Sequence, residues 1–410
     1  MFPLRIAIFA NGILSTRVGG AQKHMREVLE RLATHYEIYY FPEPQAYIDR
    51  FKCNSEYIAH LGKLKVVISE YFIQYKGDKI NINGIIEKYS EDISTCELIY
   101  DLDFQYCLEN IRYGGELSLL MSNNTGKKLG VCLQDLGDVN MHFLPEMHSG
   151  YRFARVAPKL TGLVAGIALY DYINRKLTLI KLTGAKNLSF ITIVNRSYTT
   201  NMKINFKNIY LLEPSNALDT GIKSFKGKAK ENKIIFFARL VYRKGIFDFI
   251  LIVKEILKSL RVEVVVAGQF QHSYEERYFF ELLSKYHLEK FVNYKGKLTD
   301  DELYNELSTA KAMVYPSHSD SFSISILQAI YLNTPVVAYD IAGISVYNKF
   351  NCVKLVKEFD TKAMAKATID ILNGGKVDFS DPALDSFIEQ HNSWDRVAGA
   401  HMEIIDKYIT

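Results

Sequence analysis

The chain of 410 residues is poor in several features that would place it in a specialised class of proteins. It has 5 cysteines, an odd number spread along the chain, which argues against a disulfide framework or a cysteine metal site and favours a reducing compartment. Its 50 Lys and Arg residues nearly balance 46 Asp and Glu residues, and a net charge of +4 does not indicate a nucleic-acid-binding protein. It also lacks internal repeats and low-complexity tracts. We therefore expect an ordinary globular protein.

Long hydrophobic runs and a recognisable signal peptide are also missing. The N-terminus has neither a basic region nor a small-residue cleavage site. The longest apolar run, residues 160–170, is about half of what a bilayer span requires. We expect no transmembrane helix and a cytoplasmic protein, either free or peripheral at the inner face of the membrane. Because Arg175, Lys176 and Lys181 follow this run, residues 160–181 fit a surface resting on an anionic membrane or binding a lipid-linked acceptor, or else a buried helix.

The first half of the chain alternates strand-like and helix-like segments. Residues 4–9 are typical of a strand, Gly19 and Gly20 belong to a loop, and apolar residues from Met25 to Leu32 follow at helical spacing. Further short apolar runs occur at residues 36–41, 97–102, 129–134, 190–194 and 209–212. This alternation predicts α/β topology with a parallel sheet.

The alternation is clearer in the second half. Strands are predicted at residues 234–238, 262–267, 291–294, 312–315, 336–339 and 352–356. Helices are predicted at 246–260 and 275–287, and Thr299 with Glu302 forms a capping box at the start of a third. Six strands separated by helices indicate a doubly wound sheet. Residues 220–232 are rich in lysine and glycine and are expected to be a linker, and a terminal helix begins near Trp394.

Two segments of the second half carry candidate binding residues. Arg239 and Lys244 follow the first strand and precede a helix, a position suited to a diphosphate, although a solvated basic turn would read the same way. Further along, Asp320 and Gln328 lie eight positions apart, in a segment that follows a strand and opens a helix. By itself that segment reads as a polar loop with a helix cap at Ser323.

Taken in order, these residues resemble glycosyltransferase family 4, the retaining GT-B-fold enzymes also called glycosyltransferase group 1. That family typically reads Gly-Arg-Leu and Lys-Gly, then Pro-Ser-x-x-Glu-Gly-Phe-Gly, Glu-Ala-Met and Gly-x-Pro-Val-Val-Ala. The matching residues here are Ala238-Arg239-Leu240, Lys244-Gly245, Pro316-Ser317, Asp320-Ser321-Phe322-Ser323, Gln328-Ala329-Ile330 and Asn333-Thr334-Pro335-Val336-Val337-Ala338. Residues 19–24, 213–219 and 392–394 also resemble family segments.

The resemblance implies an α/β architecture of GT-B type, in which two Rossmann-like, doubly wound parallel-sheet domains face a cleft. On this basis residues 1–219 form an acceptor-binding domain and residues 220–232 a linker. Residues 233–391 form a nucleotide-sugar-binding domain, and residues 392–410 a helix that crosses back to the first domain.

The resemblance also assigns roles to individual residues. Arg239 and Lys244 are expected to bind the donor diphosphate, Asp320 to approach the donor sugar and Gln328 to lie near the ribose. The remaining expected donor-binding residues are Gly19, Gly20, Ser321, Phe322 and Ser323. Preorganised cations and amides of this kind stabilise the charge that grows on a leaving diphosphate without a metal.

In the first half, candidates for chemistry are fewer. Asp135, which follows a strand as Gln134-Asp135, is expected either to face the cleft as a catalytic group or to cap a loop. No catalytic histidine is assigned from His142 and His148, and His24 is expected on a helix face. Asp101-Leu102-Asp103 matches the short metal signature of the unrelated GT-A enzymes, a pattern common by chance, and no metal is predicted.

Four positions depart from the family pattern. Asp320 and Gln328 replace a pair of glutamates, and Ser321 and Ser323 replace glycines. The favoured function is retaining, metal-independent hexosyl transfer from a UDP- or GDP-linked sugar to a glycan or lipid-linked acceptor, with no other cofactor. One alternative is a catalytically silent GT-B subunit that binds a nucleotide or a partner protein. The other is a GT-B-like phosphorylase or sugar epimerase.

Overall fold

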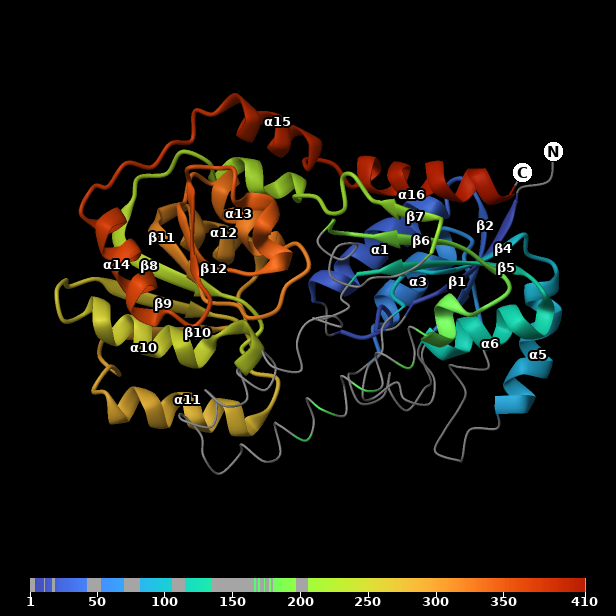
Figure 1. Cartoon of the computed structure of the whole chain (residues 1–410), viewed down its shortest axis with the longest axis horizontal. Coiled ribbons are helices and arrows are strands. Elements are labelled where there is room, and N and C mark those ends of the chain that lie inside the picture. The colour runs from blue at the N-terminus through green and yellow to red at the C-terminus, as the bar shows by residue number, and fades with distance from the viewer. Residues whose placement is uncertain are drawn as a thin grey trace. The chain divides into compact units, whose positions relative to one another are not determined.

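The computed structural model describes two compact units, each built on its own parallel sheet (Figure 1). The described residues are 4–10, 12–16, 19–42, 53–69, 82–104, 115–134, 166, 169, 173, 177, 180–196 and 206–409. The N-terminal unit comprises those up to residue 134, those from 169 to 216, and those from 394 onward. The C-terminal unit comprises residues 217–393.

The sheet of the N-terminal unit has seven strands in the order β3-β2-β1-β4-β5-β6-β7, and every pairing is parallel. The strands are β1 (Arg5–Phe9), β2 (Glu37–Phe41), β3 (Val67–Ile68), β4 (Leu98–Asp101), β5 (Lys128–Leu133), β6 (Leu188–Ile193) and β7 (Ile209–Leu211). Central strands such as β4 are buried along their whole length, as expected where helices cover both faces of a parallel sheet. The strands predicted in this half are confirmed.

Five helices of the N-terminal unit are bounded within the described residues: α1 (Gly20–Leu32), α3 (Ser55–Lys63), α5 (Ile82–Ser94), α6 (Gly115–Thr125) and α16 (Trp394–Ile409). Although α16 is the C-terminal end of the chain, it packs beside α1 (Figure 1). Arg31 Nε lies 2.6 Å from Asp395 Oδ1, and the Tyr36 hydroxyl donates to Asp406 Oδ1 at 2.6 Å. No helix among the described residues is long and apolar enough to span a bilayer.

A buried pair of histidines joins α1 to α16. His24 is 1% exposed and His401 is fully buried, and their Nε2 atoms are 3.2 Å apart. His401 Nδ1 is 2.6 Å from the hydroxyl of Tyr100, which places the pair against the sheet. Burial lowers the pKa of His24 to about 4, although contacts with Asn216 and Ser215 oppose this shift. His24 therefore lies on the buried face of α1, whereas the sequence predicted only that it lies on a helix face.

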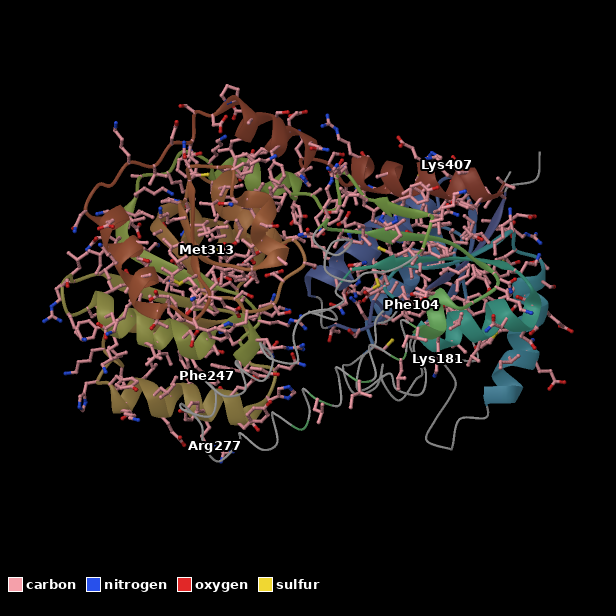
Figure 2. All side chains as sticks on the ribbon, in the orientation of Figure 1. Phe104, Lys181, Phe247, Arg277, Met313 and Lys407 are labelled. Carbon is pink, nitrogen blue, oxygen red and sulfur yellow. The ribbon has the colours of Figure 1, made fainter. Side chains whose placement is uncertain are left out.

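The C-terminal unit contains a six-stranded parallel sheet in the order β10-β9-β8-β11-β12-β13, which is the doubly wound order predicted from the sequence. Its strands are β8 (Glu231–Phe237), β9 (Glu263–Ala267), β10 (Val292–Gly296), β11 (Ala310–Tyr315), β12 (Val336–Asp340) and β13 (Val353–Lys357). Met313 lies in the middle of this core and is fully buried (Figure 2).

Helices accompany the strands in the alternation that the sequence indicated (Figure 1). They are α10 (Ile246–Ile256), α11 (Ser273–Lys285), α12 (Asp300–Thr309), α13 (Ile324–Tyr331), α14 (Thr361–Leu372) and α15 (Pro382–Gln390). The capping box at the start of α12 is present, with Thr299 accepting from the Glu302 N–H and Glu302 accepting from the Thr299 N–H. Helix α10 packs with α11 and α14, and α12 packs with α13.

The segment predicted as a linker is partly built into the C-terminal unit. It begins with the short helix η3 (Thr220–Phe225), in which Ile222 is 1% exposed, and β8 already starts at Glu231. The ring of Phe225 contacts the ring of Tyr304 on α12. These apolar side chains anchor a segment whose lysines and glycines dominate its composition. The chain passes between the units at residues 216–217 and again at 393–394.

The buried histidines predict acid-labile packing of α16. The pKa of His24 is about 4 in the folded protein and about 6.5 when unfolded, so its contribution is complete above pH 6.5 and lost as the pH falls toward 4. We expect His24 to reduce the free energy of unfolding by about 3 kcal/mol across that range. Urea unfolding followed by the fluorescence of Trp394, which lies against His24, measures this change.

His24→Gln cannot take up the proton, so its acid destabilisation should be smaller than that of the wild type. His35→Gln, at an exposed histidine just after α1, is the matched control and should leave the acid profile unchanged. An unchanged acid profile in His24→Gln would contradict the assignment.

Candidate functional site

The candidate site is built by two loops at neighbouring strands of the C-terminal unit. One follows β8 and contains the short helix η4 (Tyr242–Lys244), and the other joins β11 to α13. Strands β8 and β11 are adjacent, and the order of the sheet reverses between them. In open α/β sheets, ligands bind beyond the carboxyl ends of the strands at this reversal.

Two glycines allow these loops to pack closely. Gly245 has φ +77°, and a β-carbon there would overlap the carbonyl oxygen of Pro316. A β-carbon on Gly343 would likewise overlap the carbonyl oxygen of Asp320. The glycine of the Lys244-Gly245 pair is thus required both by its left-handed backbone and by the neighbouring loop.

Lys244 and Asp320 meet in an ion pair that bridges the two loops. Lys244 Nζ lies 3.0 Å from Asp320 Oδ2 and donates to the Ser319 carbonyl at 2.7 Å. The two side chains are 18% and 10% exposed. Arg239, the other predicted cation, is exposed just after β8. The structure thus brings Lys244 and Asp320 into direct contact and leaves Arg239 at the surface of the same loop.

The Asp320 carboxylate is directed into its own loop. Besides Lys244, its Oδ2 accepts from the Tyr315 hydroxyl at 2.6 Å. Its Oδ1 accepts from the backbone N–H groups of Ser321 at 3.1 Å and Ser323 at 3.2 Å. Both oxygens are therefore engaged, and Asp320 organises the loop that precedes α13. Contact with a donor sugar, as predicted from the resemblance, would require one of these partners to move.

The two serines that replace family glycines differ in their environment. Ser323 has φ +56°, a left-handed conformation that favours glycine, and it is the N-cap of α13 through its hydroxyl and the Ile326 N–H. The predicted helix cap is confirmed. Ser321 is half-buried in the loop. Phe322 between them is 4% exposed and packs against the rings of His391 and Phe387.

Gln328 belongs to a buried polar cluster. It is 7% exposed on α13, and it lies close enough to the Tyr304 hydroxyl to lower the pKa of that group slightly, against the larger effect of burial. That hydroxyl donates to Asp219 Oδ2 at 2.7 Å. The bond between Tyr304 and Asp219 ties α12 to the segment where the chain enters the unit. The ribose contact of Gln328 stays a prediction.

Sequence reasoning missed His318, a buried residue of the loop between β11 and α13. Its Nε2 is 3.1 Å from Asp248 Oδ2, its Nδ1 is 2.8 Å from Glu358 Oε1, and its ring stacks on Phe359. Burial favours the neutral ring, but the two carboxylates outweigh it and raise the pKa of His318 to about 9. Its backbone N–H donates to the Arg243 carbonyl at 2.9 Å. No local signal could reveal these partners, because they come from distant parts of the chain.

The predicted residues of the N-terminal unit are only partly described. Gly19 precedes α1 and donates its N–H to Gln22 Oε1 at 3.1 Å, and Gly20 is the first, exposed residue of the helix. Asp135, His142 and His148 lie outside the described residues.

The Asp101-Leu102-Asp103 segment is buried inside the N-terminal unit. Asp101 accepts from the Ser118 hydroxyl at 2.6 Å and from the Asp103 N–H at 3.2 Å. Burial raises the pKa of Asp101 to about 6, against the opposing effect of these hydrogen bonds. Within the part of the chain that the structure describes, no cluster of three or more His, Cys, Asp or Glu residues is placed to hold a metal ion.

The charged state of His318 predicts alkaline sensitivity of the candidate site. Its pKa is about 9 when folded and about 6.5 when unfolded, so its contribution is complete below pH 6.5 and lost as the pH rises through 9. We expect a loss of about 3 kcal/mol in unfolding free energy, measurable by urea titration between pH 6.5 and 10. His318→Gln should flatten this profile. Glu358→Gln should move the loss to lower pH, and an alkaline profile that neither variant changes would refute the assignment.

Comparison with known proteins agrees with this architecture. Residues 220–389 match the family model described as glycosyl transferases group 1. An uncharacterized glycosyltransferase of Methanocaldococcus jannaschii is 31% identical over 114 residues. That alignment spans 28% of this chain and only 28% of the length of this curated relative.

Solved structures match over nearly the whole chain. Anabaena HepE in complex with UDP and glucose has a TM-score of 0.68 at 14% identity, covering 98% of this chain and 99% of that protein. Sucrose-phosphate synthase of Thermosynechococcus elongatus has a TM-score of 0.67 at 15% identity, covering 98% of each chain. S. aureus TarM, in a complex that contains UDP, has a TM-score of 0.68 at 13% identity, covering 98% and 100%. The fold of this chain is therefore GT-B.

Proposed function

We propose that the protein transfers a hexosyl group, with retention at the anomeric carbon and without a metal, from a UDP- or GDP-linked sugar to a glycan or lipid-linked acceptor. The observation that carries this proposal is the position of Lys244 and Arg239, on one loop where the sheet order of the C-terminal unit reverses. The family match over residues 220–389 covers the same loop. HepE and TarM have been crystallised with UDP, which makes a UDP-linked donor the first to test.

Charge development on the leaving group explains the need for cations. When the bond between the anomeric carbon and the diphosphate oxygen breaks, that oxygen gains negative charge as a new bond forms to an acceptor hydroxyl oxygen. The Lys244 side chain is 18% exposed and already has an anionic partner, so a diphosphate oxygen can replace Asp320 as the acceptor of one of its three N–H bonds. Arg239 supplies a second charge. The acceptor proton passes to the departing phosphate, so no separate general base is needed.

The remaining residues are proposed to contact either the donor or the acceptor. The backbone at Gly19 and Gly20, at the start of α1, is proposed to contact the donor phosphates. Asp135 is proposed to face the acceptor. Donor-sugar contacts are assigned to the loop of Ser321 and Ser323, and the ribose contact to Gln328.

A catalytically silent GT-B subunit is the second candidate, and one observation favours it. At one of the two positions where the family has glutamates, both oxygens of Asp320 are bound within the C-terminal unit, and at the other position Gln328 carries no charge. Such a subunit would bind the nucleotide without transferring a sugar from the donor. Release of nucleoside diphosphate from a donor in the presence of acceptor separates the two functions.

The donor-binding role is tested by ligand-induced thermal stabilisation with UDP-glucose, GDP-mannose and ADP-glucose. One donor at 100 times its Kd should add about 2.7 kcal/mol of stability, because it binds only the folded state. We expect Lys244→Ala and Arg239→Ala to lose most of this stabilisation. Lys258→Ala, at an exposed lysine on the same unit, should keep it. Full stabilisation in both site variants would count against the proposal.

Association with a membrane surface is also proposed, on the basis of an exposed apolar stripe in the N-terminal unit. Leu169, Ile173, Leu177 and Ile180 are helical and are 41%, 47%, 50% and 66% exposed. Their spacing places them on one face of a helix, and Lys181 next to them is exposed (Figure 2). Of the apolar run 160–170, only residues 166 and 169 lie among the described residues. We propose that the stripe rests on the anionic inner face of the membrane.

Vesicle sedimentation tests this surface. Wild-type protein should sediment with phosphatidylglycerol-containing vesicles, and the double variant Leu177→Glu with Ile180→Glu should bind at least tenfold more weakly, because two exposed apolar side chains become charged. Phe280→Glu, at a 44% exposed aromatic residue on α11, is the control and should bind like the wild type. Equal binding of the double variant and the wild type would rule out this stripe as the membrane contact.

A further inference from the structure

Glu275 is a buried carboxylate that contacts the cation-bearing turn from outside the predicted motifs. It lies in the first turn of α11 and is fully buried. Its Oε1 accepts the backbone N–H of Tyr242 at 2.8 Å. Tyr242 is the first residue of η4, the three-residue helix that ends at Lys244. Glu275 therefore holds the start of the turn that presents Lys244.

Backbone hydrogen bonds also hold this turn. The His318 N–H donates to the Arg243 carbonyl, and the Lys244 N–H donates to the Val241 carbonyl, both at 2.9 Å. Before the turn, the Leu240 N–H donates to the Gln269 carbonyl at 3.0 Å. Glu275, by contrast, holds the turn through a side chain, and that side chain can change its charge.

The surroundings of Glu275 set that charge. Burial raises the pKa of Glu275 to about 7, while hydrogen bonds from the Tyr242 and His272 backbone and the nearby charge of Arg243 oppose the shift. The phenol of Tyr274 is a further titratable group that interacts with Glu275. A carboxylate accepts an N–H bond about twice as strongly as a neutral oxygen does. The hydrogen bond from the Tyr242 N–H is therefore strong when Glu275 is ionised and weak when Glu275 is protonated.

We propose that Glu275 is a positioning residue for donor binding: its ionised carboxylate fixes the Tyr242–Lys244 turn so that Lys244 can bind the donor diphosphate, and its protonation loosens the turn. The inference rests on the proposed function only in assigning the diphosphate to this turn. A donor that binds the ordered turn favours the ionised form, so acidification and donor binding oppose each other. Donor affinity should consequently fall as the pH decreases below neutrality.

Titration calorimetry between pH 8 and pH 5.5 tests the coupling. The ligand is whichever of UDP-glucose, GDP-mannose and ADP-glucose gives the largest thermal shift, since nucleotide-sugars lack the terminal phosphate monoester that would itself titrate near pH 6. Wild-type affinity should fall roughly tenfold across this range. Glu275→Gln should bind several-fold more weakly than the wild type at pH 8 and show little further loss on acidification.

Two further variants complete the comparison. Glu275→Ala should bind about tenfold more weakly at pH 8, because the Tyr242 N–H loses its acceptor. Glu276→Gln makes the same charge change at the next, exposed residue of α11 and should keep both the affinity and the pH profile of the wild type. A wild-type pH profile in Glu275→Gln, or wild-type affinity in Glu275→Ala, overturns the inference.

Hydrogen exchange of the ligand-free protein separates this inference from the proposed function. After correction for intrinsic rates, amide protection of residues 241–245 should fall on acidification in the wild type and in Glu276→Gln, but not further in Glu275→Gln. If no donor binds while this pattern holds, the donor-binding function fails and the role of Glu275 in fixing the turn survives. If protection is the same in Glu275→Ala as in the wild type, the role of Glu275 fails whatever binds.

Discussion

The ion pair between Lys244 and Asp320 is the contact on which the candidate site depends. It joins the loop after β8 to the loop after β11, and so brings side chains from two neighbouring strands into one position. Asp320 also gathers the Tyr315 hydroxyl and two backbone N–H groups, which fixes the conformation of its loop. Because the carboxylate already has other donors, Lys244 can turn toward a phosphate without leaving a buried charge unsatisfied.

Buried titratable groups in contact with the two loops hold the Lys244–Asp320 pair in place. His318 sits between Asp248 and Glu358, and Glu275 caps the turn that carries Lys244. The pKa values of His318 and Glu275 are both raised, so Glu275 gains a proton near neutral pH and His318 loses one in alkali. A buried ionic cluster adds little net stability relative to apolar residues of similar volume, although losing one of its charges is costly, and here the positions of the groups favour a role in fixing loop geometry.

The regular parts of the structure could be predicted because their signals are local. Short apolar runs locate the strands, and the Thr299–Glu302 capping box locates a helix start. The neighbours of His318 and Gln328 could not be predicted. Glu358 lies beside His318, and Tyr304 lies near Gln328, only because the fold brings distant parts of the chain together. The inward direction of Asp320 was missed for the same reason. Residues 220–232 were assigned as a linker because their lysines and glycines outnumber the apolar side chains, such as Ile222, that pack into the core.

A crystal structure of the protein with a bound nucleotide-sugar tests the central claim most directly. We predict that a diphosphate oxygen lies within hydrogen-bonding distance of Lys244 Nζ, at about 3 Å, with Arg239 turned toward the same group. Asp320 should still accept the N–H groups of Ser321 and Ser323 in that complex. A diphosphate bound elsewhere, with Lys244 still paired only to Asp320 and Ser319, would contradict the proposed site.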